Sequence, residues 1–139
     1  MANQEDRFAE LNIRLSEISV DSLMPWFKKA ERICKGFKAT THRKRGVQNR
    51  IYIVLLKDAG IRRRGYALYV GKTVRKPEER LQQHKDGYKS SKYVRKFGVR
   101  LLPELYEHLN PMSAAEAAEL EVSIAEALKK AGVPTYGGH

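Results

Sequence analysis

Four side chains that can move protons or hold an anion follow one another between residues 52 and 84. Tyr52 lies in an apolar run, Tyr69 lies near the end of a second run, and Arg80 precedes His84 by four positions. A spacing of four places Arg80 and His84 on one face of a helix. If the two runs pair as a hairpin, both phenols lie on one side of the sheet. Two phenols, a guanidinium and an imidazole could then meet in a small volume and act on a phosphate.

The last predicted helix offers these groups a carboxylate. Glu121 falls inside the apolar arc of that helix, whereas its other glutamates point away. A lone carboxylate on a buried face is costly unless it is paired or bound to a metal ion. Glu121 therefore either pairs with a core cation such as Arg80 or holds a metal. The arc consists of Ala117, Leu120, Ile124, Leu128 and Ala131.

A phosphate-loop motif is excluded, although Gly71-Lys72-Thr73 has its last three residues. That motif needs a further glycine five residues before Gly71, where Tyr66 stands. Structural alternatives remain open for the candidate residues. The tyrosines could be strand formers, His84 a surface histidine, and Arg80 and Lys72 solvated cations.

The elements that would position these residues can be read from the apolar pattern. Residues 51–56 are apolar throughout, which predicts a strand covered on both faces. Residues 66–71 predict a second strand paired with it, and a third is expected near 99–107. Pro77 opens the helix that carries Arg80 and His84, and Gly87 ends it.

The start of the last helix has its own signature. Ser113 followed by Glu116 forms a capping box, and Met112 and Ala117 are placed for a hydrophobic staple. The sequence therefore predicts where the helix carrying Glu121 begins.

The N-terminal part has a different character. Apolar residues recur at helical spacing over 3–18, a second helix is expected from near Asp21 to Lys35, and 38–50 is polar and basic. We therefore divide the chain into residues 1–49, an N-terminal helical extension with a basic connector, and a core domain, 50–139.

The charge of the chain favours a polyanionic partner. The 139 residues include 27 Lys and Arg against 16 Asp and Glu, a formal net charge of +11. Nucleic acid is the first candidate and an anionic membrane surface the second. No apolar run is long enough to cross a bilayer and no secretory signal is visible, so we expect a cytoplasmic protein.

Metal ligands of the zinc type are not clustered in this sequence. There is one cysteine, Cys34, and the histidines are scattered. A hard, oxygen-bound cation is therefore expected instead. The histidines are His42, His84, His108 and His139.

Basic residues are concentrated in three segments: the connector, the loop between the first two strands, and the region after Gly87. Such density favours phosphate contacts, although a solvated basic face is the alternative. The candidates are Arg43, Lys44, Arg45, Arg62, Arg63, Arg64, Lys89, Lys92, Arg95 and Lys96.

Together these motifs resemble the GIY-YIG nuclease superfamily. Arg50-Ile51-Tyr52 resembles its first signature, with Arg in place of Gly, and Tyr69-Val70-Gly71 resembles the second. Arg80 resembles the catalytic arginine, His84 the His or Tyr one turn later, and Glu121 the metal-binding glutamate. The resemblance covers about residues 50–138, and the motifs stand in the order of the family.

The resemblance implies an α+β fold with a three-stranded antiparallel sheet flanked by helices. It implies a DNA endonuclease that uses one divalent metal, Mg²⁺ or Mn²⁺, held by Glu121. Many members carry an asparagine after the last helix, where this chain has Thr135-Tyr136-Gly137-Gly138.

The resemblance also implies roles for the other residues. Tyr52 would activate the water, helped by Tyr69 or His84, and Arg80 would neutralise charge on the phosphate. Lys72 would assist at the phosphate or lower the pKa of Tyr52.

Two alternatives to a nuclease are compatible with the basic composition. A nucleic-acid-binding module could keep the fold without cutting, but it would have little reason to keep all five site residues. A basic membrane-surface protein predicts a basic amphipathic helix. Residues 3–18 instead mix acids with bases.

Overall fold

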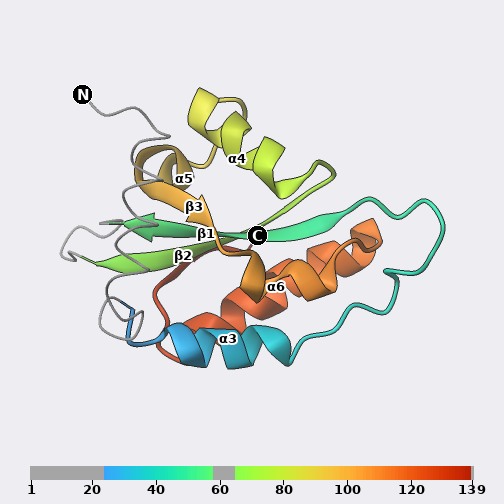
Figure 1. Cartoon of the computed structure of the whole chain (residues 1–139), viewed down its shortest axis with the longest axis horizontal. Helices are drawn as coiled ribbons and strands as arrows, with labels where there is room; N and C mark the ends of the chain where they lie inside the picture. The colour runs from blue at the N-terminus through green and yellow to red at the C-terminus, as the bar shows by residue number, and fades with distance from the viewer. Residues whose placement is uncertain (1–23, 58–64, 139) are drawn as a thin grey trace.

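The computed structural model describes residues 24–57 and 65–138 (Figure 1). The predicted helix over 3–18, the basic tip Arg62–Arg64 and His139 lie outside these residues. Within them, helices lie on both sides of a central sheet (Figure 1). None of the helices in these two ranges is both long and apolar enough to cross a membrane.

The sheet has four strands in the order β3-β1-β2-β4. The predicted hairpin is confirmed, because β1 (Arg50–Lys57) pairs antiparallel with β2 (Tyr66–Thr73). β3 (Gly98–Leu101) adds antiparallel to the other edge of β1. A short fourth strand that the sequence did not indicate, β4 (Thr135–Gly137), lies parallel to β2. The predicted α+β class is confirmed, with this one strand added.

Both faces of β1 are covered, as its apolar sequence predicts. Residues 51–56 are each at most 2% exposed. α4 (Pro77–Asp86) and α5 (Lys92–Phe97) lie on one side of the sheet (Figure 1). α3 (Phe27–Lys35) and α6 (Ala114–Lys130) lie on the other (Figure 1). A β-branched and aromatic strand buried on both faces is typical of the centre of such a layered fold.

The third strand is shorter than predicted, since β3 ends at Leu101 and not near residue 107. Pro103 explains this end, because proline has no N–H to donate to the strand ladder. Two short 3₁₀ turns follow, η1 (Pro103–Leu105) and η2 (Glu107–Leu109). They bring Asn110 to β1, where its amide accepts from the Ile51 N–H at 2.8 Å and donates to the Ile51 carbonyl at 2.7 Å.

The helix boundaries agree with the sequence where its signals were strongest. α4 begins at Pro77 and stops before Gly87, whose φ of 86° is the left-handed conformation that glycine favours. α3 ends at Lys35 as expected. It begins only at Phe27, after a turn in which the Phe27 N–H donates to the Met24 carbonyl at 2.9 Å.

The capping box at α6 forms only in part. The Glu116 N–H donates to Ser113 Oγ at 3.2 Å, as predicted. The Glu116 carboxylate does not return to Ser113 but accepts from the amides and hydroxyls of Thr40 and Thr41 at 2.6–3.0 Å. The Ser113 N–H donates to Thr41 Oγ1 at 2.8 Å instead. The start of the basic connector is therefore bound to the start of α6.

Glu116→Gln is expected to lower the melting temperature by a few degrees at neutral pH and not at low pH. The hydrogen bonds from Thr41 and Thr40 lower the pKa of Glu116 from its ordinary 4.5 to about 2. The pKa of Glu116 is lower in the folded state than in the unfolded state. Its hydrogen bonds therefore stabilise the fold fully above pH 4.5, and this stabilisation is lost as the pH falls toward 2. Thermal melts of both proteins from pH 2 to pH 7 measure the effect. Glu119→Gln, at an exposed position of the same helix, is the control, and a pH-independent difference would contradict the account.

Candidate active site

The strand register places the two predicted tyrosines on one face of the sheet. Tyr52 lies opposite Gly71 and Tyr69 lies opposite Val54, so the two phenols are diagonal neighbours on adjacent strands. Their ring centroids are 6.2 Å apart.

Gly71 is required by the Tyr52 ring. A Cβ built on Gly71 would lie 2.5 Å from Tyr52 Oη and 2.7 Å from its Cε1, well inside van der Waals contact. The ring therefore lies across the backbone of β2, and any larger residue at 71 would displace it.

His84 reaches the same face from α4 and is 1% exposed, so it is not a surface histidine. Its Nε2 lies 2.7 Å from Tyr52 Oη, and its Nδ1 accepts from the Ser91 N–H at 2.9 Å. Burial, followed by repulsion from Arg80 and Lys85, lowers the pKa of His84 to about 4, so the ring is neutral at pH 7. Because Nδ1 is an acceptor, the single ring proton is on Nε2 and is donated to Tyr52 Oη.

Arg80 is fixed in place by acceptors on its own side of the sheet. Its Nη1 donates to Gln83 Oε1 at 3.1 Å and to the Tyr88 carbonyl at 3.2 Å, and its Nη2 donates to the Lys89 carbonyl at 2.7 Å. The guanidinium lowers the pKa of the Tyr52 phenol by its charge and by a hydrogen bond. Arg80 is therefore a held cation beside the phenols and not a freely solvated one.

Burial dominates the acidity of both phenols. It raises the pKa of Tyr52, and the neighbouring Tyr69 raises it further, while Arg80 partly offsets the shift. Burial likewise raises the pKa of Tyr69, which a hydrogen bond from Ser91 partly offsets. In the metal-free protein both phenols therefore keep their protons at neutral pH. A Tyr52 that acts as a base would need additional positive charge nearby.

Glu121 comes from the other layer, on α6, and is 4% exposed, so its predicted place on the buried face is confirmed. Burial raises its pKa to about 7, against the lowering effect of the Lys72 charge and of a hydrogen bond with the Lys72 backbone. Its charge raises the pKa of both Tyr52 and Tyr69, so the carboxylate acts electrostatically on both phenols. Among the residues described, Glu121 forms no ion pair with Arg80.

The sheet edge explains the contact between Glu121 and Lys72. The Leu68 N–H and the Val70 carbonyl face the β4 side, where they bond to Pro134 and Gly138. Backbone groups of every second residue face the same side, so the Lys72 amide does as well. The pairing with β4 ends at Val70, which leaves this amide to Glu121.

Glu121 is the carboxylate that the described residues could offer to a metal beside the phenols. Across residues 24–57 and 65–138, no group of three His, Cys, Asp or Glu residues could hold a metal ion. Mg²⁺ keeps most of its water and needs only one or two carboxylates, so Glu121, buried and in no ion pair with another described residue, fits such a cation.

Lys72 is exposed, and its side chain lies on a different face of the sheet from the two tyrosines. It lies opposite Ile51, one residue from the Tyr52–Gly71 pair, so its side chain is on the other face of the sheet from Tyr52. The pKa that its charge lowers is that of Glu121. A role toward Glu121 is thus better supported than a role toward Tyr52.

Three residues around the site were not anticipated from the sequence. Ser91 precedes α5 as its N-cap and contacts His84 and Tyr69. Tyr136 on β4 lies beside Tyr69 in the sheet and stacks on Tyr93 of α5 at 4.3 Å. β4 (Thr135–Gly137) thus places Tyr136 between Tyr69 of the sheet and Tyr93 of α5. The serine before the short helix was the only sequence signal for any of the three.

The described residues include the predicted basic surface except for Arg62, Arg63 and Arg64. Arg43, Lys44 and Arg45 are exposed in the connector. The cations after Gly87 are exposed on the α4–α5 turn and on α5, which lies on the Tyr52 side of the sheet (Figure 1). They are Lys89, Lys92, Arg95 and Lys96.

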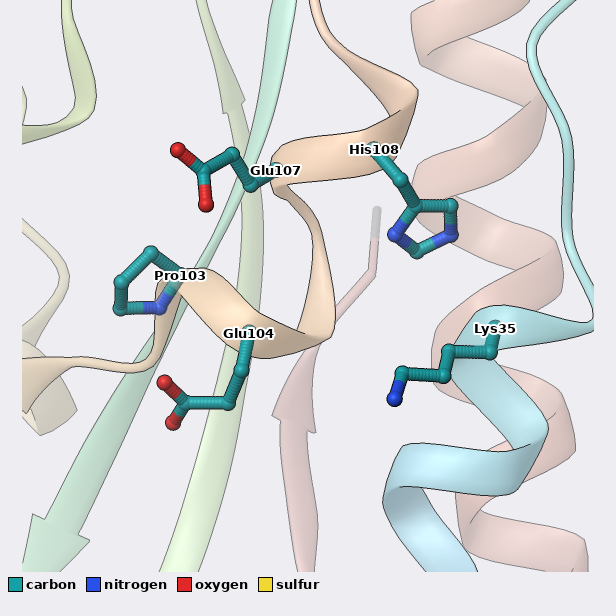
Figure 2. A pocket seen from close by; sticks show the side chains of 5 residues that line it. All are labelled: Lys35, Pro103, Glu104, Glu107 and His108. Carbon is teal, nitrogen blue, oxygen red and sulfur yellow. The ribbon is translucent and has the colours of Figure 1, made fainter.

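A separate hollow of about 530 Å³ lies between α3 and the 3₁₀ turns. Figure 2 shows the carboxylates of Glu104 and Glu107 on one side of it and Lys35 and His108 on the other. The fifth lining residue is Pro103. The hollow contains none of the candidate site residues, and its mixed charge is poorly suited to a polyanion.

The comparisons with known proteins agree with the geometry. A family model described as the GIY-YIG catalytic domain matches residues 48–132. No curated protein and no solved structure was found to match the chain.

Proposed function

Because the chain belongs to the GIY-YIG catalytic domain family, a nuclease family, we propose that it is a metal-dependent endonuclease that hydrolyses phosphodiester bonds in DNA. One observation carries the proposal. The buried Tyr52–His84 hydrogen bond of 2.7 Å lies beside Tyr69 and Arg80 on one face of the sheet, within the electrostatic reach of Glu121.

Tyr52 is the group that would take a proton from the attacking water. His84 Nε2–H donates to its phenolic oxygen, and this donor would stabilise the phenolate. His84 therefore assists as a donor and not as the base. Arg80, already held by three acceptors, would neutralise charge on the phosphate without having to reorganise.

Glu121 would hold the divalent cation, Mg²⁺ or Mn²⁺. Such a cation stabilises the negative charge that develops on a leaving phosphate ester oxygen. Burial raises the pKa of Glu121 to about 7, so the ionised carboxylate that would bind the cation is unfavourable in the metal-free protein. Lys72, whose charge favours the ionised carboxylate, would support Glu121 in this role.

Cleavage of supercoiled plasmid tests the proposal directly. The purified full chain is expected to nick or linearise plasmid with Mg²⁺ or Mn²⁺ and not with EDTA. A protein that binds the plasmid and never cuts it, at any concentration of either metal, would favour the non-cleaving binding module. The division at residue 49 and the cytoplasmic location stay predictions.

Binding to DNA is expected to depend steeply on salt, because each neutralised phosphate releases a counterion. Replacing Lys92, Arg95 and Lys96 together by Ala should reduce the slope of log affinity against log salt by up to about three units. Fluorescence anisotropy with a labelled duplex from low to moderate salt measures this slope.

The control for that variant carries the same loss of charge elsewhere. Lys28, Arg32 and Lys130 are exposed on α3 and α6, across the sheet from α5 (Figure 1). Their replacement by Ala should leave the slope nearly unchanged. Equal slopes for both triple variants would show that α5 is a solvated face and not a phosphate-binding one.

A further inference from the structure

The turn between α4 and α5 forms hydrogen bonds with more than one of the catalytic candidates. We propose that Ser91, which closes this turn, is a positioning residue that orients both His84 and Tyr69 in the active site. The proposal rests on the nuclease function proposed above and assigns a task to a residue outside the family motifs.

Ser91 has three contacts that point in different directions. Its N–H donates to His84 Nδ1 at 2.9 Å, and hydrogen bonding by its side chain lowers the pKa of the Tyr69 phenol. Its Oγ also accepts from the Tyr93 N–H at 3.2 Å, which caps α5. Since the amide of Tyr93 uses a lone pair of Oγ, the hydroxyl proton of Ser91 is available for donation to Tyr69 Oη.

The same turn holds Arg80. The carbonyls of Tyr88 and Lys89 accept from its guanidinium at 3.2 and 2.7 Å. Lys89 has a φ of 42°, in the left-handed region that residues other than glycine seldom adopt. Strained backbone of this kind persists where surrounding contacts require it and is concentrated at functional sites. Three residues of this turn, Tyr88, Lys89 and Ser91, thus act on Arg80, His84 and Tyr69.

These contacts decide which groups at the site donate. With Ser91 donating to Nδ1, His84 can only donate through Nε2, so the Tyr52 oxygen is an acceptor. The side chain of Ser91, which lowers the pKa of Tyr69, would make the second phenolic oxygen an acceptor as well. If Nδ1 lost its donor, the other tautomer would become available, and His84 would compete with the water for the Tyr52 proton. Ser91 therefore keeps His84 out of the role of base.

Nitrogen-15 NMR of the full chain, without DNA or metal, tests the first contact. At pH 7 the His84 resonances, assigned by comparison with His84→Gln, should show an unprotonated Nδ1 and a protonated Nε2. A protonated Nδ1 would overturn the proposal, whatever the protein does to DNA.

Substitution of Ser91 tests the second contact. Ser91→Ala should lower kcat about 10-fold through imprecise positioning, with KM for DNA changed by less than about 2-fold. Ser91→Thr keeps both the hydroxyl and the cap and should recover most of the rate. Ser91→Gly removes the hydroxyl but is tolerated at an N-cap, so it replaces the alanine variant if that variant unfolds. Ser123→Ala, at an exposed position of α6, should behave as wild type.

The outcomes separate this proposal from the nuclease proposal. Wild-type kcat in Ser91→Ala or Ser91→Gly, or a threonine variant no better than alanine, would overturn the role of Ser91. If the wild-type chain does not cut DNA, the nuclease proposal fails. The NMR experiment then decides alone whether Ser91 orients His84.

Discussion

Glu121→Gln is expected to fold, to bind DNA and to show no detectable cutting at any concentration of Mg²⁺ or Mn²⁺. The amide keeps the shape of the side chain but has no charge with which to hold a divalent cation. The basic surface is unchanged, so affinity for a labelled duplex in EDTA should be that of the wild type. Cleavage assays across a metal titration, with that binding assay alongside, measure the two properties.

The same substitution should stabilise the metal-free protein in a defined pH range. Burial raises the pKa of Glu121 from its ordinary 4.5 to about 7, so the folded state binds a proton more tightly than the unfolded state does. Ionisation of Glu121 therefore costs no folding free energy below pH 4.5. The cost grows as the pH rises from 4.5 to about 7 and is constant at higher pH. That cost is at most about 3–4 kcal/mol, at 1.36 kcal/mol per pKa unit.

Melting temperatures in EDTA at pH 5 and pH 8 should show this dependence. The advantage of Glu121→Gln over the wild type should be small at pH 5 and larger at pH 8. Mg²⁺ should raise the melting temperature of the wild type and not that of the variant, since only a bound cation stabilises the fold. Glu119→Gln removes the same charge from an exposed position of the same helix and is the control. A Glu121→Gln protein that still cuts would remove Glu121 from the metal site.

Tyr52→Phe is expected to reduce the cleavage rate by roughly 10²-fold or more, because it removes the group that would take the proton. The ring and its packing over Gly71 are retained. The variant leaves His84 Nε2–H without its partner in a buried site, which should destabilise the fold by about 1–3 kcal/mol. Single-turnover cleavage with saturating enzyme separates the chemical step from binding.

A second buried tyrosine supplies the control for Tyr52. Tyr106 is 3% exposed, so Tyr106→Phe removes a phenolic hydroxyl from the core without touching the site. It should cut at a rate near that of the wild type. If Tyr52→Phe cut as fast as Tyr106→Phe, then Tyr52 would be a packing residue and another base would have to be sought.

Much of the scaffold follows from local sequence patterns. The apolar run of β1 predicts a strand with both faces covered, and residues 51–56 are buried accordingly. Pro77 and Gly87 bound α4 because their backbone preferences act on their own neighbours. Glu121 was placed on a buried face because helical periodicity alone determines which residues share an arc. Each of these inferences needs only residues close together in the chain.

The elements that the sequence did not indicate are short and lack periodicity. α5 has six residues and β4 has three, too few for a pattern to repeat. β4 is held on β2 by backbone hydrogen bonds at its two ends, from Leu68 N–H to the Pro134 carbonyl and from Gly138 N–H to the Val70 carbonyl.

Partners that are distant in the sequence were decided by the tertiary structure alone. The spacing of Arg80 and His84 predicts a shared face, but the donor that sets the His84 tautomer is the backbone of Ser91. The capping pattern predicts that Glu116 returns to Ser113, yet its carboxylate binds Thr40 and Thr41, 76 and 75 residues away. The order of residues determined which side chains this protein could use for chemistry. Packing of the two helical layers against the sheet decided which of them are desolvated and which atom of each donates, because burial and hydrogen-bond direction depend on neighbours that no local pattern specifies.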